Sequence, residues 1–206
     1  MDDWYLNPFG NDLIDAGLSY DYKAIGSKNN DILKGYAGDN FGKDLLEGKG
    51  GEDQLFGYRG ADTLYGGKGD DTLRAGNGRD VIDGGDGSDT MYGGFGLNTF
   101  EDADDGEIDQ LFFKSDQHAY NWIYDKAGNS PNGQKADKIM ELDEFDEIFV
   151  QGVEAEELDF QNVVHLSNLG ETLDGIGIYA SGTLEAVYIG DNLSISQLES
   201  MTQGII

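Results

Sequence analysis

The sequence predicts an all-β protein whose first half is a stack of short repeated strands and whose second half is a strand-rich cap. Three observations lead to this prediction. A nine-residue repeat fills residues 39–101, Gly supplies 32 of the 206 residues while Pro supplies only 2, and short apolar runs alternate with acidic turns after residue 101. Abundant glycine with little proline indicates turns of defined backbone geometry rather than a disordered chain.

Seven contiguous nonapeptides make up residues 39–101, and three of their positions are nearly invariant. Position four is always glycine: Gly42, Gly51, Gly60, Gly69, Gly78, Gly87 and Gly96. Position six is acidic in six units and an amide in the last: Asp44, Asp53, Asp62, Asp71, Asp80, Asp89 and Asn98. Position eight is always apolar: Leu46, Leu55, Leu64, Leu73, Ile82, Met91 and Phe100. The last three residues of each unit therefore suit a short strand whose middle side chain points inward.

The repeat continues upstream in a degenerate form. Residues 26–34 keep Asp31 at the acidic position, and residues 7–15 keep Asp12 there. Between them, residues 16–24 place Lys23 at the apolar position, and the spacing slips by a few residues. We interpret residues 1–38 as degenerate first turns interrupted by a bulge or a short loop.

The glycine and aspartate columns together have the chemistry of a hard-cation site. Glycine lets the backbone turn tightly and approach an ion, and calcium takes 6–8 oxygen ligands from carboxylates and backbone carbonyls. Residues 39–101 carry thirteen acidic and six basic residues, so stacked aspartates would repel one another without cations. We therefore expect metal binding and folding to be one event. A flexible linker is the alternative, but an apolar column would have no role in a linker.

The repeat resembles that of the RTX (repeats-in-toxin) family of calcium-binding proteins, whose consensus is G-G-x-G-x-D-x-U-x, where U is a large apolar residue. The units at 66–74 and 84–92 match every specified position. The resemblance implies a right-handed parallel β-roll, a form of β-helix, in which two nonapeptides make one turn. It also implies Ca²⁺ bound in two rows, between each loop and the loop two repeats later.

Carried onto this chain, the resemblance pairs the acidic positions into four well-formed sites: Asp44 with Asp62, Asp53 with Asp71, Asp62 with Asp80, and Asp71 with Asp89. Asp80 with Asn98 makes a weaker fifth site, because Asn is a neutral ligand. Asp31 with Asp53 and Asp12 with Asp31 are further pairs that the slips interrupt. The glycines at position four supply the calcium-loop backbone. We expect about four to five ions, and more if the degenerate repeats also bind.

Residues 102–206 are expected to close the open end of the roll, because an exposed strand edge invites aggregation. Six short apolar runs read as strands: 111–113, 139–142, 148–150, 163–166, 176–179 and 186–189. Ser194 and Gln197 form a capping box that begins a short helix, which Gly204 is placed to end. By resemblance, residues 194–206 are also compatible with a type I secretion signal. A purely structural helix is the other interpretation of this segment.

Two further features leave alternatives open. Asp102, Asp104, Asp105 and Asp109 form an acidic knot after the last repeat, which we interpret as a solvated turn rather than an extra ion site. Phe56, Arg74 and Tyr92 fall at the ninth position of alternate repeats and would stack in one outward column. That column is either a platform for a carbohydrate or a cell surface, or a surface that the second half covers.

Composition narrows the function. A net charge of −28 disfavours nucleic acid and anionic membranes as partners, and no apolar run is long enough to insert into a membrane. The sequence has neither H-E-x-x-H nor G-x-S-x-G, so we expect no enzymatic activity. No N-terminal signal peptide is visible. The resemblance implies an extracellular protein that is exported by type I secretion machinery and folded by Ca²⁺. A calcium-dependent module of a larger secreted enzyme or adhesin is the alternative.

Overall fold

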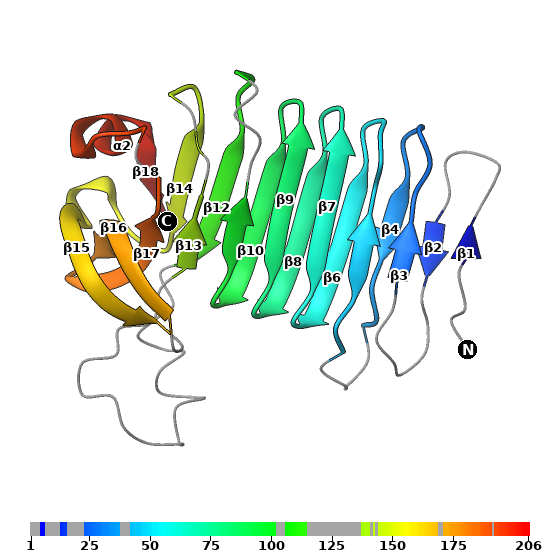
Figure 1. Cartoon of the computed structure of the whole chain (residues 1–206), viewed down its shortest axis with the longest axis horizontal. Coiled ribbons are helices and arrows are strands. Elements are labelled where there is room, and N and C mark those ends of the chain that lie inside the picture. The colour runs from blue at the N-terminus through cyan, green and yellow to red at the C-terminus, as the bar shows by residue number, and fades with distance from the viewer. Residues whose placement is uncertain are drawn as a thin grey trace.

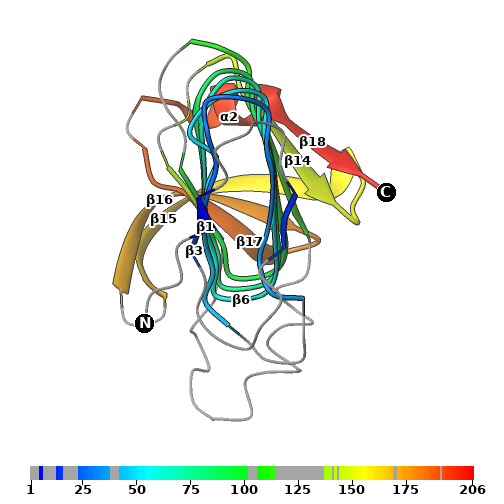
Figure 2. The same cartoon turned by 90° about the vertical axis from the view of Figure 1, so that its right-hand side faces the viewer.

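Two β-sheets face each other along a solenoid in the computed structural model of the chain (Figure 1). The structure describes residues 5–6, 13–15, 23–37, 42–101, 106–114, 137–140, 142, 144–168, 171–190 and 192–206. Seen along the axis, the coil is a flattened oval whose long sides are the two sheets (Figure 2). Loops at the two narrow ends of the oval carry the chain from one sheet to the other.

Sheet A has ten strands and sheet B has eight. The strands of sheet A, in spatial order, are β1 (Tyr5–Leu6), β3 (Lys23–Ile25), β5 (Leu45–Glu47), β7 (Thr63–Lys68), β9 (Val81–Asp86), β11 (Thr99–Glu101), β13 (Asp137–Ile139), β17 (Thr183–Tyr188), β16 (Glu171–Ala180) and β15 (Leu158–Asn168). Those of sheet B are β2 (Leu13–Asp15), β4 (Ile32–Lys34), β6 (Gln54–Gly60), β8 (Thr72–Gly78), β10 (Thr90–Gly96), β12 (Gln110–Lys114), β14 (Glu147–Gln151) and β18 (Thr202–Ile205).

The parallel register of the repeats equals two nonapeptides. Leu55 of β6 pairs with Leu73 of β8, and Leu64 of β7 pairs with Ile82 of β9. Successive nonapeptides therefore alternate between the two sheets, and every second one lies directly on its predecessor. The predicted all-β fold, a parallel β-roll followed by strands and one short helix, is confirmed.

The core is a column of apolar side chains between the sheets, one from each short strand. All are at most 1% exposed: Ala24, Leu33, Leu46, Leu55, Leu64, Leu73, Ile82, Met91, Phe100, Leu111, Ile139 and Ile148. Burying each large member is worth about 1.5–3 kcal/mol. One position of this column differs from the prediction. In the degenerate unit at residues 16–24, Ala24 and not Lys23 faces inward. Lys23 instead forms an ion pair with Glu47 at 2.5 Å. The one-residue slip at Ile25 shifts the register, and in a strand one residue changes the face.

Both sheets run across residue 101 within the described ranges. Strand β12 pairs in parallel with β10, and β13 pairs in parallel with β11, so the second half adds further turns before it changes architecture. The six apolar runs predicted as strands each overlap one of the strands β12 to β17. The division into 1–101 and 102–206 stays a prediction.

An antiparallel unit and one helix finish the chain. Strands β15 and β16 form a long hairpin, and β16 pairs with β17 at the end of sheet A. The helix α2 (Ile195–Met201) has the predicted capping box at Ser194, but it ends at Met201 and not near Gly204. The residues after it form β18, which pairs with β14, so sheet pairing overrides the glycine stop signal. A one-turn 3₁₀ helix, η1 (Ala155–Glu157), precedes β15. No helix in the described part of the chain is long and apolar enough to cross a membrane.

Candidate metal centre

The aspartates of the repeat form a hydrogen-bonded ladder between successive turns. The backbone N–H of each Asp donates to the Oδ1 atom of the Asp one turn later, as Asp53 does to Asp71 at 2.7 Å and Asp62 to Asp80 at 2.9 Å. Within the regular nonapeptides the spacing between partners is 18 residues, the length of one turn. The Oδ1 atom of each of these aspartates therefore links its own turn to the preceding one.

The ladder has two rows, one at each narrow end of the oval. Row A precedes the strands of sheet A and contains Asp44, Asp62, Asp80, Asn98 and Asp137. Row B precedes the strands of sheet B and contains Asp31, Asp53, Asp71, Asp89, Asp109 and Asp146. The predicted pairs from Asp31 to Asn98 are thus all brought together. Asp12 lies outside the described residues.

The second carboxylate oxygen is buried without a hydrogen-bond partner in four inner members of the ladder. Asp53, Asp62, Asp71 and Asp80 are each 1% exposed, and their Oδ2 atoms have no partner. Burying a carboxylate oxygen without a partner is costly unless a cation or donor compensates it. In the first members the backbone already compensates, since Ser27 N–H donates to Asp31 Oδ2 at 2.5 Å and Tyr36 N–H to Asp44 Oδ2 at 2.7 Å.

A backbone carbonyl borders the same small space as each unpartnered oxygen at three of these places. A Cβ added at Gly66 would lie less than 3.0 Å from both Asp71 Oδ2 and the Gly84 carbonyl oxygen. The same holds at Gly57 for Asp62 and at Gly48 for Asp53. We call the space beside such a glycine a cradle. Each cradle is lined by a carboxylate oxygen and a carbonyl oxygen and contains no side chain of its own.

The pKa values of these carboxyls show how much the ladder needs a positive charge. Burial raises the pKa of Asp62 to about 8 from an ordinary value of 3.8, and hydrogen bonding to the backbone N–H only partly opposes this. Burial likewise raises the pKa of Asp71 and Asp80 to about 7 and that of Asp53 to about 6. Repulsion from neighbouring ladder aspartates adds to the effect at Asp53, Asp62 and Asp71. A bound divalent cation would favour the ionised forms instead.

The donor set of the cradles fits calcium. Calcium accepts mixed carboxylate and carbonyl oxygens in flexible geometry, whereas zinc prefers Cys and His ligands. The sequence has no Cys and only two His. Within the described ranges, no group of three or more His, Cys, Asp or Glu side chains is placed to hold a metal ion. Backbone carbonyls would therefore supply much of the coordination.

The predicted calcium-loop glycines lie where successive turns touch. Gly69, for example, has a φ of 101°, and a Cβ there would meet the Gly51 backbone of the preceding turn. The carbonyl oxygens of Gly42, Gly60 and Gly78 accept backbone N–H groups from the following turn. These glycines thus allow the close approach that the ladder needs, and their metal-binding role stays a prediction.

Three ladder members were missed by the sequence analysis. Asp109, Asp137 and Asp146 are each at most 2% exposed and accept the same backbone hydrogen bond as the repeat aspartates. The interpretation of Asp109 as part of a solvated turn is therefore wrong. Asp102, Asp104 and Asp105 lie outside the described residues. The signal that could have found the three is the tripeptide Asp-x-apolar that begins each strand: Asp109-Gln110-Leu111, Asp137-Lys138-Ile139 and Asp146-Glu147-Ile148.

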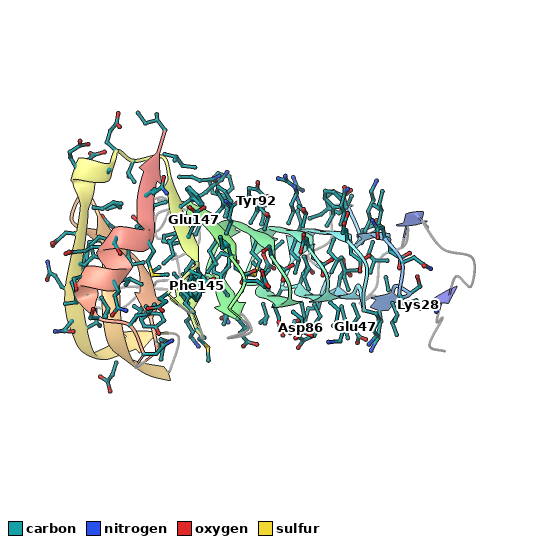
Figure 3. The ribbon with its side chains drawn as sticks, turned by 90° about the horizontal axis from the view of Figure 1, so that it is seen from above. Lys28, Glu47, Asp86, Tyr92, Phe145 and Glu147 are labelled. Atoms are coloured by element: carbon teal, nitrogen blue, oxygen red, sulfur yellow. The ribbon has the colours of Figure 1, made fainter. Side chains whose placement is uncertain are left out.

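The predicted outward column exists on the outer face of sheet B. Arg74 lies 4.0 Å above the Tyr92 ring, and Tyr92 stacks on Phe112 at 4.6 Å between ring centroids. Phe149 extends the stack from Phe112 at 4.5 Å. The second half therefore lengthens this column with its own strands. Figure 3 shows Tyr92 and Glu147 along one side of the roll and Glu47 along the other. Both faces of the Tyr92 and Phe112 rings are therefore occupied within the column.

Comparisons with known proteins agree with this geometry. A family model that describes four copies of the RTX calcium-binding nonapeptide repeat matches residues 24–41, 40–73 and 65–100. Comparisons with curated proteins and with solved structures gave no match.

Proposed function

Residues 24–100 of this chain belong to the RTX family of calcium-binding repeats, and from that premise we propose that calcium binding drives the folding of the β-roll outside the cell. The observation that carries the proposal is the set of buried Oδ2 atoms without partners, three of which face a cradle. An apo roll would have to hold these carboxyls protonated or leave their charges buried and mutually repelling.

The residues that would hold the ions are the ladder aspartates and the carbonyls that border their cradles. Asp53, Asp62 and Asp71 each present an Oδ2 atom beside a carbonyl oxygen of the next turn. A bound Ca²⁺ would neutralise the carboxylates and link adjacent turns. The chain's own contribution is the 18-residue register, which places one carboxylate per turn in each row.

The extracellular setting is part of this proposal, and the usual affinity of extracellular calcium modules supports it. Extracellular calcium modules work at about 10⁻⁴–10⁻³ M, whereas the cytosol keeps calcium far lower. The chain would stay unfolded inside the cell and fold after export, and by family membership we propose type I secretion machinery as the exporter. The role of residues 194–206 as its signal belongs to this proposal.

We also propose that this chain acts through calcium binding and not through catalysis. The described carboxyls whose pKa burial raises to about 6 or above all belong to the ladder. As proposed ion ligands, these four carboxyls would not be available as general acids. A calcium-dependent module within a larger secreted enzyme or adhesin would use the same roll.

Circular dichroism of the full chain tests the proposal. In chelator the strand signal should be largely lost, and millimolar Ca²⁺ should restore it. Mg²⁺ should fail, because it requires a small and regular octahedral shell. Asp71→Asn should raise the calcium midpoint, whereas the matched change Asp174→Asn at an exposed position should not. A spectrum that is unchanged after complete calcium removal would contradict calcium-driven folding.

A further inference from the structure

We infer that the two rows take up calcium unequally, with row B filling at lower calcium than row A. The inference rests on the proposed calcium binding and adds to it a chain-specific asymmetry. It is carried by the residues that line the cradles and by the charges on the surrounding loops.

Row B has two consecutive cradles, at Gly48 and Gly66, and Gly84 continues the series with the same open space beside its aspartate. Gly48, Gly66 and Gly84 stand beside Asp53, Asp71 and Asp89, and a Cβ at any of these glycines would lie less than 3.0 Å from the Oδ2 atom of its aspartate. The space next to each of these carboxylates is therefore kept free by the absence of a side chain.

The first members of both rows, at Gly26 beside Asp31 and Gly35 beside Asp44, already have a backbone donor to their Oδ2 atoms. After them, row A has only one such cradle, at Gly57 beside Asp62. In the next turn Ala75 takes the place of the glycine, since Tyr58 pairs with Gly76 and its neighbour Gly57 therefore aligns with Ala75. Ala75 is fully buried, so its methyl group points into the interior where the other turns carry only a hydrogen. The cradle of Asp80 is thus narrowed by a real side chain.

One turn further, row A carries an amide in place of a carboxylate. Asn98 Oδ1 accepts the hydrogen bond from Asp80 N–H at 3.2 Å, which fixes the orientation of the amide. The Nδ2 group therefore faces the space beside Gly93, where it is buried without an acceptor. An N–H donor cannot ligate a cation. The ring of Phe100 also reaches to within 3.0 Å of the Cβ position of Gly93.

The charges of the loops around the two rows also favour calcium binding in row B. In row B, residues 48–53, 66–71 and 84–89 carry six acidic and two basic side chains. In row A, the corresponding residues 57–62, 75–80 and 93–98 carry two of each, the basic ones being Arg59 and Arg79, both exposed. A neighbouring positive charge weakens the binding of a divalent cation by a factor of about two to five at moderate salt.

Equilibrium calcium binding to the full chain, followed by calorimetry, tests the inference with a matched pair of variants. Asn98→Asp places a carboxylate oxygen in the row A cradle, whereas Asn77→Asp adds the same charge at an exposed position of the same loops. The wild type should show two classes of sites. Asn98→Asp should add an ion or tighten the weaker class about tenfold, because ligand charge tunes such sites. Asn77→Asp adds a charge but no ligand, so it should change the affinity of the weaker class by no more than about two- to fivefold and add no ion.

A second pair keeps the test decisive if Asn98→Asp fails to fold. Arg79→Gln should tighten the weaker class about two- to fivefold and leave the tighter class unchanged. Arg74→Gln, on the outer face of sheet B, should alter neither. A single class of sites, or equal isotherms for Arg79→Gln and Arg74→Gln, overturns the inference while leaving calcium binding intact. A wild-type chain that binds no calcium overturns the proposed function itself.

Discussion

The backbone N–H of Asp53 donates a 2.7 Å hydrogen bond to the Oδ1 atom of Asp71, one turn further along the roll. The same Asp71 carboxylate presents its Oδ2 atom, without a hydrogen-bond partner, to the cradle beside Gly66. One oxygen thus serves the backbone and the other is left for a cation. Two effects of changing Asp71 can therefore be separated: the loss of the backbone hydrogen bond and the loss of the ligand charge. An amide side chain can keep the hydrogen bond but cannot supply the charge.

Asp71→Asn and Asp71→Ala should therefore behave differently. Both should raise the calcium midpoint, since both remove a ligand charge. Only Ala should also leave the buried Asp53 N–H without its acceptor, at a cost of about 1–3 kcal/mol in the free energy of unfolding at saturating calcium. Asn98 shows that an amide can keep this bond, at 3.2 Å from Asp80 N. Urea unfolding of both variants measures the difference, and equal values would contradict a structural role for Oδ1.

The apo roll should lose stability as the pH rises. Burial raises the pKa of Asp62 to about 8 and that of Asp71 to about 7, both above the ordinary 3.8. Between pH 4 and 8 the folded apo chain therefore binds more protons than the unfolded chain, so this stability is complete at low pH and is lost as the pH passes through the folded values.

In chelator, we expect more strand signal by circular dichroism at pH 5 than at pH 8. In millimolar calcium the order should reverse, because protons compete with the ion for the same carboxylates. The wild type in both buffers forms its own control. A chelated chain that gains strand signal with rising pH would show that the ladder carboxyls are not protonated in the apo fold.

Replacing Lys49 by Gly should stabilise the calcium-loaded roll. Lys49 has a φ of 86° at a repeat position where Gly67 and Gly85 have 117° and 100°. A side chain in this left-handed region costs about 1 kcal/mol, which glycine would relieve. Lys49 also pairs with Glu47 at 2.6 Å, but the Lys49 side chain is exposed and Glu47 keeps Lys23 as a second partner, so losing this ion pair costs less than about 1 kcal/mol.

The matched variant is Lys49→Ala, which loses the same ion pair but keeps the strain. Thermal unfolding should therefore rank Lys49→Gly above Lys49→Ala by about 1 kcal/mol. If the two variants unfold at the same temperature, the positive φ at this position carries no strain worth relieving.

The repeat predicted the roll because each of its columns has a single physical role at a fixed spacing. Leu64 and Ile82 meet because they are 18 residues apart, and the same number brings Asp62 to Asp80. The pattern fails after residue 101, where the spacing from Asp89 to Asp109 becomes 20 residues and that from Asn98 to Asp137 becomes 39. Connecting segments of unequal length in the sequence hide the period, and the glycine column ends at the same place.

Other features depend on contacts that the sequence does not display. The sequence predicts that Gly204 ends the helix. In the structure Gly204 instead lies in β18, against the backbone of Val153 and Glu154. Pairing with β14 decides the conformation there, and β14 is more than 50 residues away in sequence. The blocked cradles at Ala75 and Asn98 likewise become visible only when the neighbouring turns are in place.

Asp109 should matter as much as a repeat aspartate, although it lies beyond the residues that match the family model. It accepts the Asp89 N–H at 2.7 Å and is 1% exposed. Asp109→Ala should lower the free energy of unfolding at saturating calcium by about 1–3 kcal/mol, since a buried N–H loses its acceptor. Glu107→Ala, two residues earlier and exposed, is the control and should change it by less than about 0.5 kcal/mol. If the two variants lower the free energy of unfolding equally in urea, Asp109 does not stabilise the roll as a ladder member.

The last prediction is that the strands after residue 101 are required to close the roll. Met91 of β10 pairs with Leu111 of β12, and Phe100 of β11 pairs with Ile139 of β13. All four side chains are fully buried, so a chain truncated after Glu101 would expose two strand edges and the end of the apolar column. Each large side chain that loses its cover costs about 1.5–3 kcal/mol, and unpaired parallel edges invite aggregation.

Calcium alone should not compensate for this loss, because the ladder lies at the narrow ends of the oval and cannot cover the exposed core. Residues 1–101 should stay largely unfolded, or aggregate, at calcium concentrations that fold the full chain. Circular dichroism with light scattering measures both outcomes, and the full chain carrying Asp174→Asn serves as the control for handling. If residues 1–101 fold as a monomer with the calcium midpoint of the full chain, then β12 and β13 are not needed to close the roll. The second half would then be better interpreted as an independent domain, and a ligand-binding or catalytic role for it would gain weight.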